Sequence, residues 1–512
     1  MPPTTPGTAA PTPDRSPDPA PGLGPRAAAV LVFGSSAAVL VVELVALRLL
    51  APYLGLTLTT STLVIGLALS AVALGSWAGG RAADRVDPRR TLAPLLALSG
   101  AAVAATPALV RTAAEVGGGA LLLPAATASI VVPGALLSAV TPMVTKLRLT
   151  SLDETGTVVG RYSGIGTAGS IAGTVLTGFV LVAAVPVSAI LVGLGVLLVV
   201  AGIATAAAVH GLPGAARAAA LPVALVAAGG LAAVVAPGGC DAETAYHCLV
   251  LEEDPDREGG RLLLLDGVRH SYVDLDDPEH LEFAYVRAVA AAADAAYPSD
   301  APLRAHHVGG GGLTVPRWLA VTRPGTTSTV SEIDPGVVAV DTAELGVDEG
   351  PALDVRVEDG RLGLGRLADA SVDLVVGDAF GGVTVPWHLT TREALAEVAR
   401  VLDDGGVYVA NLIDHGALAF ARAKVATLRE AFAHVAVLAE PATLARGDDA
   451  GGNLVVVAGD RPVDPAALAA GLEARGTGWG VLVGDDVDAW VGGAEVLTDD
   501  HAPVDQLLQP YG

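Results

Sequence analysis

Long apolar runs fill the first half of the chain. They cover about 27–51, 58–80, 91–110, 118–142, 163–184, 187–209 and 217–237. Each is close to the roughly 20 residues that a helix needs to cross about 30 Å of hydrocarbon. A soluble helical domain would show a polar face repeating every 3.6 residues, and these runs show none. The pattern predicts an α-helical multi-pass membrane domain of about seven helices over residues 27–237.

A different pattern begins after residue 238. Short β-rich runs come first, in AYHCLVLEE, RLLLLDGV and HSYVDL, and predict a small β-domain over 238–275. A helix-like stretch, PEHLEFAYVRAVAAAADAAY, follows. Predicted strands then alternate with helices, at about 304–308, 327–333, 353–357, 372–378, 405–412 and 453–458. Near-continuously apolar strands in such an alternation are typical of a parallel sheet covered on both faces. Residues 276–512 are therefore predicted to form an α/β domain.

Composition supports this division. The chain has 512 residues, of which 52% are hydrophobic and only 16% charged, whereas soluble domains carry about 25% charge. The net charge of −24 argues against a nucleic-acid partner, whose phosphates need Lys and Arg. Residues 1–26 are Pro-rich and predict a disordered tail. Glu43 lies inside the first apolar run, where it is either functional or a protonated structural residue.

Candidate chemistry gathers where the predicted strands end, because a doubly wound sheet binds its ligand at these ends. A loop of four glycines lets a ligand approach the backbone before a helix N-terminus: Gly309, Gly310, Gly311 and Gly312. Glu332 ends the next strand and can accept both hydroxyls of a ribose. Asp359 follows the strand after that and can accept from an adenine amino group. Each alone is explained as a cap or turn residue, but the ordered set predicts a nucleoside site.

Asp378 extends this set. It ends a buried strand in SVDLVVGDAFGGVTVPWHLTTREAL and is expected to point into the same crevice. A carboxylate there can accept a proton from an amine nucleophile, or bind the amine as its ammonium.

The motifs of residues 240 to 508 resemble those of the spermidine synthase family, the aminopropyltransferases, and especially its membrane-fused bacterial members. They are LLLLDGVRHSYVDLDDPEHLEFAYVR, HHVGGGGLTVPRWLA, SEIDPGVV, VEDGRL, VGDAFGGVTVPWHLTTREALAEVARVL and LTDDHAPVDQLL. The resemblance implies a small β-domain before a Rossmann-like, methyltransferase-type domain. It also implies transfer of an aminopropyl group from decarboxylated S-adenosylmethionine to putrescine. Glu332 would then bind the ribose, Asp359 the adenine, and Asp378 would activate the amine.

The chain departs from the family pattern at three places. The family's glycine loop reads GGGDGG, but Gly312 and Leu313 stand here instead. The family's Asp-Ser-Ser-Asp is Asp378-Ala379-Phe380-Gly381, and its Gln after the Asp-Gly turn is His270. His270 remains a candidate to bind the substrate. Compensation for the missing carboxylates is expected from residues placed where the β-domain closes over the site: Asp276, Asp277, His280 or Glu282. Alternatively, PEHLEF merely starts a helix, with acids near its positive end.

Two other functions fit the same sequence. One is a methyltransferase that uses S-adenosylmethionine, and the other is a non-catalytic membrane transporter or sensor with a nucleoside-binding domain. No Cys/His spacing indicates a metal, and the chemistry requires none. The expected partners are a small-molecule amine and the lipid bilayer, and a homo-oligomer is left open.

The side of the membrane that holds the C-terminal domain follows from charge and cysteines. Basic residues gather after the second, fourth and sixth predicted spans: Arg81, Arg85, Arg89, Arg90, Lys146, Arg148, Arg161 and Arg217. This bias predicts a cytoplasmic N-terminus, so seven crossings would leave the C-terminal domain outside. There Cys240 and Cys248, the two cysteines of the chain, could pair. Adenosyl sulfonium compounds, however, are made in the cytoplasm, and a seventh run that lay along the interface would return the domain inside.

Overall fold

The computed structural model describes residues 23–55, 58–149, 151–236, 239–382, 384–447 and 450–508. The chain divides into two compact units. The first comprises Met1–Leu44, Gly66–Gly178 and Ser188–Ala236. The second comprises Val45–Ile65, Phe179–Val187 and Pro237–Gly512. The predicted tail lies outside the described residues up to position 22, and the first helix begins at Pro25.

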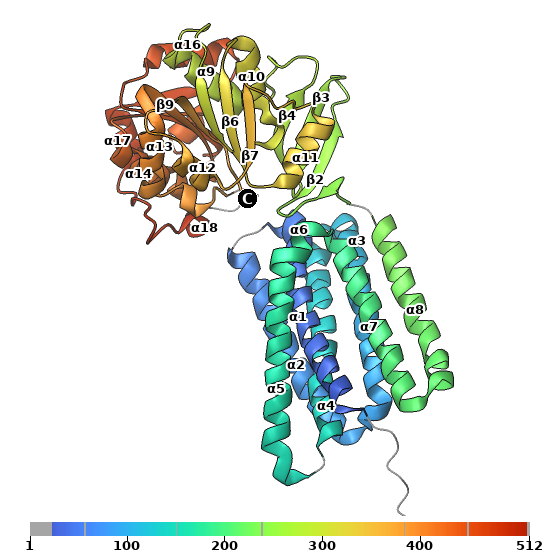
Figure 1. The fold of residues 1–512 in the computed structure, drawn as a ribbon. Coiled ribbons are helices and arrows are strands. Elements are labelled where there is room, and N and C mark those ends of the chain that lie inside the picture. The colour runs from blue at the N-terminus through green and yellow to red at the C-terminus, as the bar shows by residue number, and fades with distance from the viewer. Residues whose placement is uncertain are drawn as a thin grey trace, which may run out of the picture. The chain divides into compact units, whose positions relative to one another are not determined.

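Helices make up residues 25–235 (Figure 1). They are α1 (Pro25–Leu54), α2 (Leu58–Arg85), α3 (Pro88–Ser138), α4 (Val140–Arg148), α5 (Thr155–Leu176), α6 (Val182–Ala184), α7 (Val187–His210) and α8 (Leu212–Val235), with the short turns η1 (Leu152–Glu154) and η2 (Thr177–Leu181). Within the described residues, six stretches are long and apolar enough to cross a membrane: Pro25–Leu54, Leu58–Arg85, Pro88–Val116, Ala120–Arg148, Thr155–Leu181 and Val187–His210. The seventh predicted span coincides with α8, whose apolar part, Ala219–Val235, is shorter.

Glycines allow close helix packing in the first unit. A Cβ on Gly100 of α3 would lie 2.5 Å from the carbonyl oxygen of Gly195 on α7, so the two backbones touch only because both residues lack side chains. Helix α8 packs along the first part of α3. Ala215 clusters with Ala93 and Val226 with Ala104. Further along, the Arg111 guanidinium donates to the Ala233 carbonyl at 3.1 Å. Through these three contacts the residue numbers increase in the same direction along both helices, so α8 runs parallel to this part of α3.

The second unit contains a four-stranded antiparallel sheet in the order β1-β2-β3-β4. Its strands are β1 (Ala242–Glu243), β2 (Cys248–Glu253), β3 (Gly260–Leu265) and β4 (Val268–Asp274). They lie within the predicted small β-domain.

An eight-stranded sheet forms the centre of the α/β domain, in the order β12-β10-β11-β9-β8-β5-β6-β7. Its strands are β5 (Arg304–Val308), β6 (Thr327–Glu332), β7 (Leu353–Val357), β8 (Val372–Gly377), β9 (Leu402–His415), β10 (His434–Ala439), β11 (Gly451–Gly459) and β12 (Gly480–Val483). Strands β5 to β9 are parallel, as predicted. The prediction of a wholly parallel sheet is wrong at one edge, where β10, β11 and β12 pair antiparallel. There β10 and β11, which pair antiparallel, are joined by residues 440–450, whose described part contains only the short helix α15 (Pro441–Leu444).

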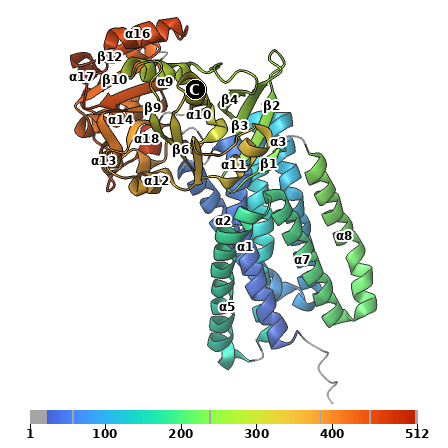
Figure 2. The same ribbon diagram turned by 45° about the horizontal axis from the view of Figure 1, so that its top comes forward.

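Helices cover both faces of this sheet (Figures 1 and 2). They are α9 (Ala284–Ala296), α10 (Thr314–Thr322), α11 (Pro335–Glu344), α12 (Gly360–Arg366), α13 (Arg392–Val401), α14 (Ala419–Ala431), α15 (Pro441–Leu444), α16 (Pro465–Ala474), α17 (Asp485–Val491) and α18 (Val504–Leu507), with the short turns η3 (Gly311–Leu313) and η4 (Trp387–Leu389). Neighbouring residues of β8 point to opposite cores: Val375 packs with α13 and α14, whereas Leu374 and Val376 pack with α9, α10 and α16. This explains why Leu374, Val375 and Val376 follow one another as apolar residues.

One helix starts later than its sequence pattern predicts. The stretch from Pro278 is not helical until Ala284, and Phe283 before it is extended. Residues 276–283 therefore form a connection between β4 and α9, and the acids in it do not lie on a helix.

Candidate active site

The site lies at the topological switch point of the large sheet, between β5 and β8. The loops that follow these two strands are in contact. Gly309 has a φ of +102°, and a Cβ there would lie 2.3 Å from the Asp378 carbonyl oxygen. The Asp378 amide donates to the Val308 carbonyl at 2.8 Å. Only glycine fits at position 309, and this close approach holds Asp378 beside the glycine loop.

A small cavity of about 90 Å³ lies on one side of this junction. Gly309, Gly310 and Gly311 line it together with Glu332. Glu332 Oε2 accepts from the Gly310 amide at 2.7 Å, and Oε1 accepts from the Asp334 amide at 2.8 Å. Burial raises the pKa of Glu332, against the lowering effect of these two hydrogen bonds. The carboxylate is thus held by backbone on the cavity wall, as a ribose-binding group requires.

Asp359 lines the same cavity. It caps α12, and its Oδ1 accepts from the amides of Arg361 at 2.9 Å and Leu362 at 3.1 Å. Its other oxygen pairs with His388 Nε2 at 2.8 Å. Burial acts to raise the pKa of Asp359, but these hydrogen bonds hold it below its usual value. The carboxylate is therefore ionised and oriented, with His388 as a partner that the sequence did not indicate.

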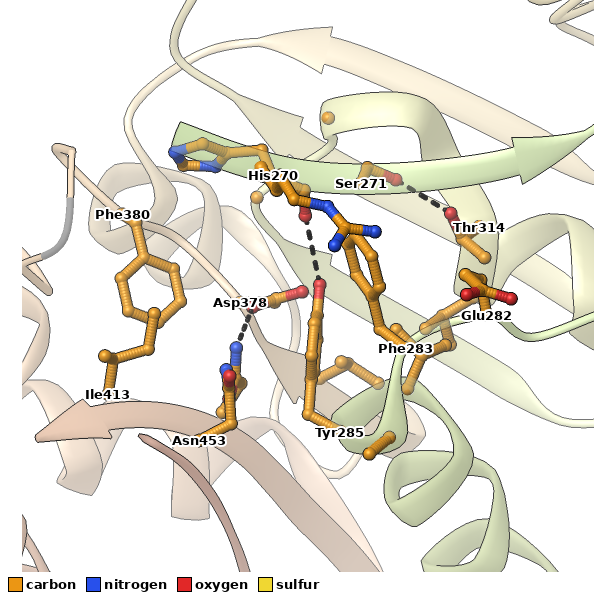
Figure 3. Close-up of a pocket in the computed structure, with 18 of the residues that line it drawn as sticks. His270, Ser271, Glu282, Phe283, Tyr285, Thr314, Asp378, Phe380, Ile413 and Asn453 are labelled. Carbon is orange, nitrogen blue, oxygen red and sulfur yellow. Dashed lines mark hydrogen bonds between the residues drawn. The ribbon is translucent and has the colours of Figure 1, made fainter. Parts of the chain in front are cut away.

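A larger cavity of about 520 Å³ lies on the other side. It shares several lining residues with the small one: His270, Gly309, Gly310, Gly311, Asp378 and Phe380. The two cavities therefore meet at the glycine loop and Asp378. Figure 3 shows Phe380 and Ile413 on one side of the larger cavity, and Thr314 and Glu282 on the other.

Asp378 is held by side chains from other elements. Asn411 Nδ2 on β9 donates to Asp378 Oδ1 at 2.9 Å, and Asn453 Nδ2 on β11 donates to Asn411 Oδ1 at 2.9 Å. The Tyr285 hydroxyl on α9 donates to the His270 carbonyl at 3.3 Å and also faces Asp378 (Figure 3). Burial raises the pKa of Asp378 to about 6, against the lowering effect of Asn411 and Tyr285. A carboxylate with this pKa is a competent base near neutral pH.

His270 lines both cavities. Burial lowers its pKa to about 4, and the neighbouring His247, 6.2 Å away between ring centroids, lowers it further. Its Nε2 has no hydrogen-bond partner among the described residues. The ring is neutral at physiological pH, so it can contact a cationic substrate without repelling it.

Of the residues predicted to compensate for the missing carboxylates, only some lie at the site. Glu282 lines the larger cavity. Asp277 accepts from Arg257 at 3.4 Å, and His280 Nε2 pairs with Glu282 at 3.2 Å. Asp276, Asp277 and His280 line neither cavity. They belong instead to the connection that leads into α9.

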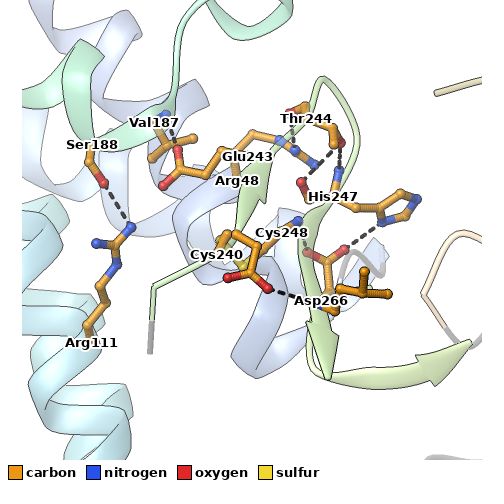
Figure 4. Close-up of a disulfide and its surroundings, with 12 residues drawn as sticks. Arg48, Arg111, Val187, Ser188, Cys240, Glu243, Thr244, His247, Cys248 and Asp266 are labelled. Carbon is orange, nitrogen blue, oxygen red and sulfur yellow. Dashed lines mark hydrogen bonds and ion pairs between the residues drawn. A yellow bond between two sulfur atoms is a disulfide. The ribbon is translucent and has the colours of Figure 1, made fainter. Parts of the chain in front are cut away.

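A disulfide lies near the small cavity, in β-strand surroundings of the second unit (Figure 4). It joins Cys240 to Cys248. Next to it, His247 Nδ1 pairs with the buried Asp266 at 2.8 Å, and Asp266 also accepts from the Cys248 amide at 2.9 Å. His247 itself lines the small cavity, so the disulfide adjoins the wall of this cavity. Within the described residues, no group of acids, histidines and cysteines could hold a metal ion.

Sequence reasoning missed three residues of this site. His388 lies in the quoted segment after Asp378, but Asp359 is 29 residues away in sequence, so no local signal linked the two residues. Tyr285 and Asn411 carried no local signal, because their roles come from contacts with Asp378 across the sheet.

No family model matches the chain. A polyamine aminopropyltransferase of Vibrio vulnificus is 32% identical over 177 residues, 33% of this chain and 58% of that protein. One of Chromobacterium violaceum is 30% identical over 142 residues, 28% and 53% respectively. The chain thus spans just over half the length of these relatives. The crystal structure of a probable spermidine synthase from Corynebacterium glutamicum is 30% identical, with a TM-score of 0.48, over 54% of this chain and 100% of that one.

These relatives identify a spermidine synthase-like domain in the C-terminal part of the chain. The family resemblance predicted from the motifs is thereby confirmed for this part.

Proposed function

We propose that the spermidine synthase-like domain is a transferase that moves an aminopropyl group from decarboxylated S-adenosylmethionine to an amine such as putrescine. The observation that carries the proposal is the position of Asp378. It stands where a cavity with nucleoside-binding groups meets a second, larger cavity. Both curated relatives bear the name polyamine aminopropyltransferase. An adenosyl donor would occupy the small cavity, and its three-carbon chain and the acceptor would occupy the larger one.

The chain's own residues would then act as follows. Glu332 accepts the ribose hydroxyls, and Asp359, held by His388, accepts from the adenine amino group. The amine nitrogen attacks the carbon bonded to sulfur, the carbon–sulfur bond breaks, and its electron pair stays on sulfur. Asp378 takes the proton that the amine loses. The sulfonium is already a good leaving group, so positioning and this proton transfer are what the protein supplies.

A product assay tests the proposal. The purified full-length protein is incubated with decarboxylated S-adenosylmethionine and a panel of amines, and products are identified by mass. Methylthioadenosine together with an aminopropylated amine is the expected result. Donor binding without any product would favour the non-catalytic sensor or transporter, and adenosylhomocysteine formed from S-adenosylmethionine would favour the methyltransferase.

We also propose that the chain is a multi-pass protein of the cell membrane and that the domain after α8 lies on the outer side. Helix α3 begins next to Arg89 and Arg90, which the charge bias places in the cytoplasm. The first part of α3 therefore leads outward. Because α8 packs parallel to it through Ala215, Val226 and Ala233, α8 leads outward too. The disulfide of Cys240 and Cys248 fits an oxidising compartment.

Labelling of intact cells with a membrane-impermeant thiol reagent tests the location. Labelling that appears only after mild reduction is expected, since both cysteines are paired. Absence of labelling until the cells are lysed would place the domain inside and contradict the proposal.

A further inference from the structure

The glycine loop cannot carry a carboxylate where the family pattern has one. Gly312 has a φ of +74°, and a Cβ there would lie 2.5 Å from Ser271 Oγ. A side chain at this position would meet both backbone strain and a clash with β4. The loop itself therefore supplies no carboxylate to bind an ammonium group of the donor.

The acid that contacts Gly312 itself lies on the side of the loop away from the larger cavity. Asp341 on α11 accepts from the Gly312 amide at 3.2 Å through each carboxylate oxygen. It is 1% exposed and does not line the larger cavity. Burial raises its pKa to about 8. Asp341 thus supports the loop from behind and cannot reach a donor in the cavity.

Two charged side chains of opposite sign do line this end of the cavity, Arg269 and Glu282. The Arg269 guanidinium lies 5.1 Å from the Phe283 ring centroid and forms no ion pair with any residue that the structure describes. Glu282 pairs with His280 rather than with Arg269. The Arg269 guanidinium, and the Glu282 carboxylate oxygen that does not pair with His280, are therefore available to a ligand.

Two hydroxyl groups, those of Ser271 and Thr314, also line this end of the larger cavity. Thr314 Oγ1 donates to the Tyr272 carbonyl at 2.9 Å, which leaves Ser271 to donate to Thr314 at 2.9 Å (Figure 3). With their protons used in this way, the two hydroxyls offer lone pairs to the cavity. They suit an ammonium group beside Glu282, whereas the planar Arg269 guanidinium suits a carboxylate.

An ammonium and a carboxylate on one carbon are the end of an α-amino acid. We propose that this cavity takes S-adenosylmethionine, with its carboxylate intact, as a further donor, and transfers its 3-amino-3-carboxypropyl group to the amine. This inference rests on the proposed function of the same site. The amine nitrogen bonds to the chain carbon next to sulfur, and the carbon–sulfur bond breaks with its electron pair left on sulfur. Asp378 accepts the proton, and methylthioadenosine leaves as it does with the decarboxylated donor.

Charge variants separate the two donors. Arg269→Gln should weaken binding of S-adenosylmethionine by about tenfold or more, because it removes the partner of the carboxylate. It should leave the decarboxylated donor nearly unchanged. Glu282→Gln should weaken both donors, since both carry the ammonium. Arg261→Gln is the matched control, because Arg261 pairs with Glu253 on the same sheet and lines neither cavity.

The measurements are calorimetric titration of the full-length protein with each donor, and product masses with putrescine as acceptor. Methylthioadenosine plus a carboxylated aminopropyl product from S-adenosylmethionine supports the inference. Three results overturn it: no binding of S-adenosylmethionine while the decarboxylated donor turns over, equal loss of both donors in Arg269→Gln, or formation of adenosylhomocysteine. If only the decarboxylated donor binds and turns over, this inference fails but the proposed function stands. If neither donor binds or reacts, the proposed function fails as well.

Discussion

The two cavities of the candidate site are built differently. In the small cavity, Glu332 and Asp359 are each held by two backbone amides close to them in sequence or at the adjoining strand end. In the larger cavity, Asp378 is held by side chains from β9 and α9. The arrangement in the small cavity follows from strand ends and a helix cap, and it agrees with the family pattern. The arrangement in the larger cavity depends on elements that are far apart in sequence, and it is here that the chain departs from the family pattern. Under the proposed function, recognition of the nucleoside would be separated from the choice of the transferred group and of the acceptor amine.

The largest expected effect comes from removing the proposed base, where the two cavities meet. Asp378→Asn should reduce turnover by about 10²-fold or more, because the amine loses its base, while donor binding stays within a few-fold of the wild type. Turnover is measured with saturating donor, and binding by calorimetry. Asp300→Asn, a change at an exposed acid outside both cavities, is the control. Turnover that persists in Asp378→Asn would assign the base to another group.

The second prediction alters the small cavity instead, at Glu332. Glu332→Gln should weaken binding of an adenosyl ligand by about 1–3 kcal/mol, because a neutral amide cannot accept the ribose hydroxyls as the carboxylate does. Turnover at saturating donor should fall much less. Glu344→Gln, at an exposed acid on the following helix, is the control. Unchanged affinity in Glu332→Gln would remove this residue from the site.

The pH dependence of turnover sharpens the role of Asp378. Its pKa is raised to about 6, so the ionised base is present above that pH and is lost as the pH falls through it. Turnover should therefore rise through pH 6 to a plateau. Asn411→Leu removes a hydrogen bond that lowers this pKa, so the rising limb should move upward by about one pH unit. If turnover rose at the same pH in the wild type and in Asn411→Leu, a group other than Asp378 would be the one that titrates.

The smallest expected effect tests the backbone support of Asp359. His388→Gln removes the imidazole that pairs with Asp359, but two backbone amides continue to hold the carboxylate. Binding of an adenosyl ligand should weaken by only about 0.5–1 kcal/mol, the range for such pairs. A loss as large as that in Glu332→Gln would mean that His388 contacts the ligand directly.

Much of the fold could be predicted because it depends on local patterns. Apolar runs of about 20 residues located the long helices, and alternating apolar strands located β5 to β9 and β11. Strands β10 and β12 were missed. Their pairing is antiparallel, and only the assembled sheet provides the partners that make such short segments strands. The late start of α9 at Ala284 has the same kind of cause, since helical propensity alone does not mark where tertiary contacts begin.

The sequence by itself determined the half of the site that the backbone supports. A glycine run after a strand, an acid at the next strand end and an Asp before a helix each have a local physical reason, so Glu332 and Asp359 could be placed with the glycine loop. The tertiary structure alone decided which side chains surround Asp378 and which charges face the end of the loop. Tyr285, Asn411 and Asn453 come from three separate elements, and Asp341 lies behind the loop while Arg269 lies in front of it. Such distinctions depend on which way packed elements turn their side chains, and that is settled only when the sheets and helices pack together.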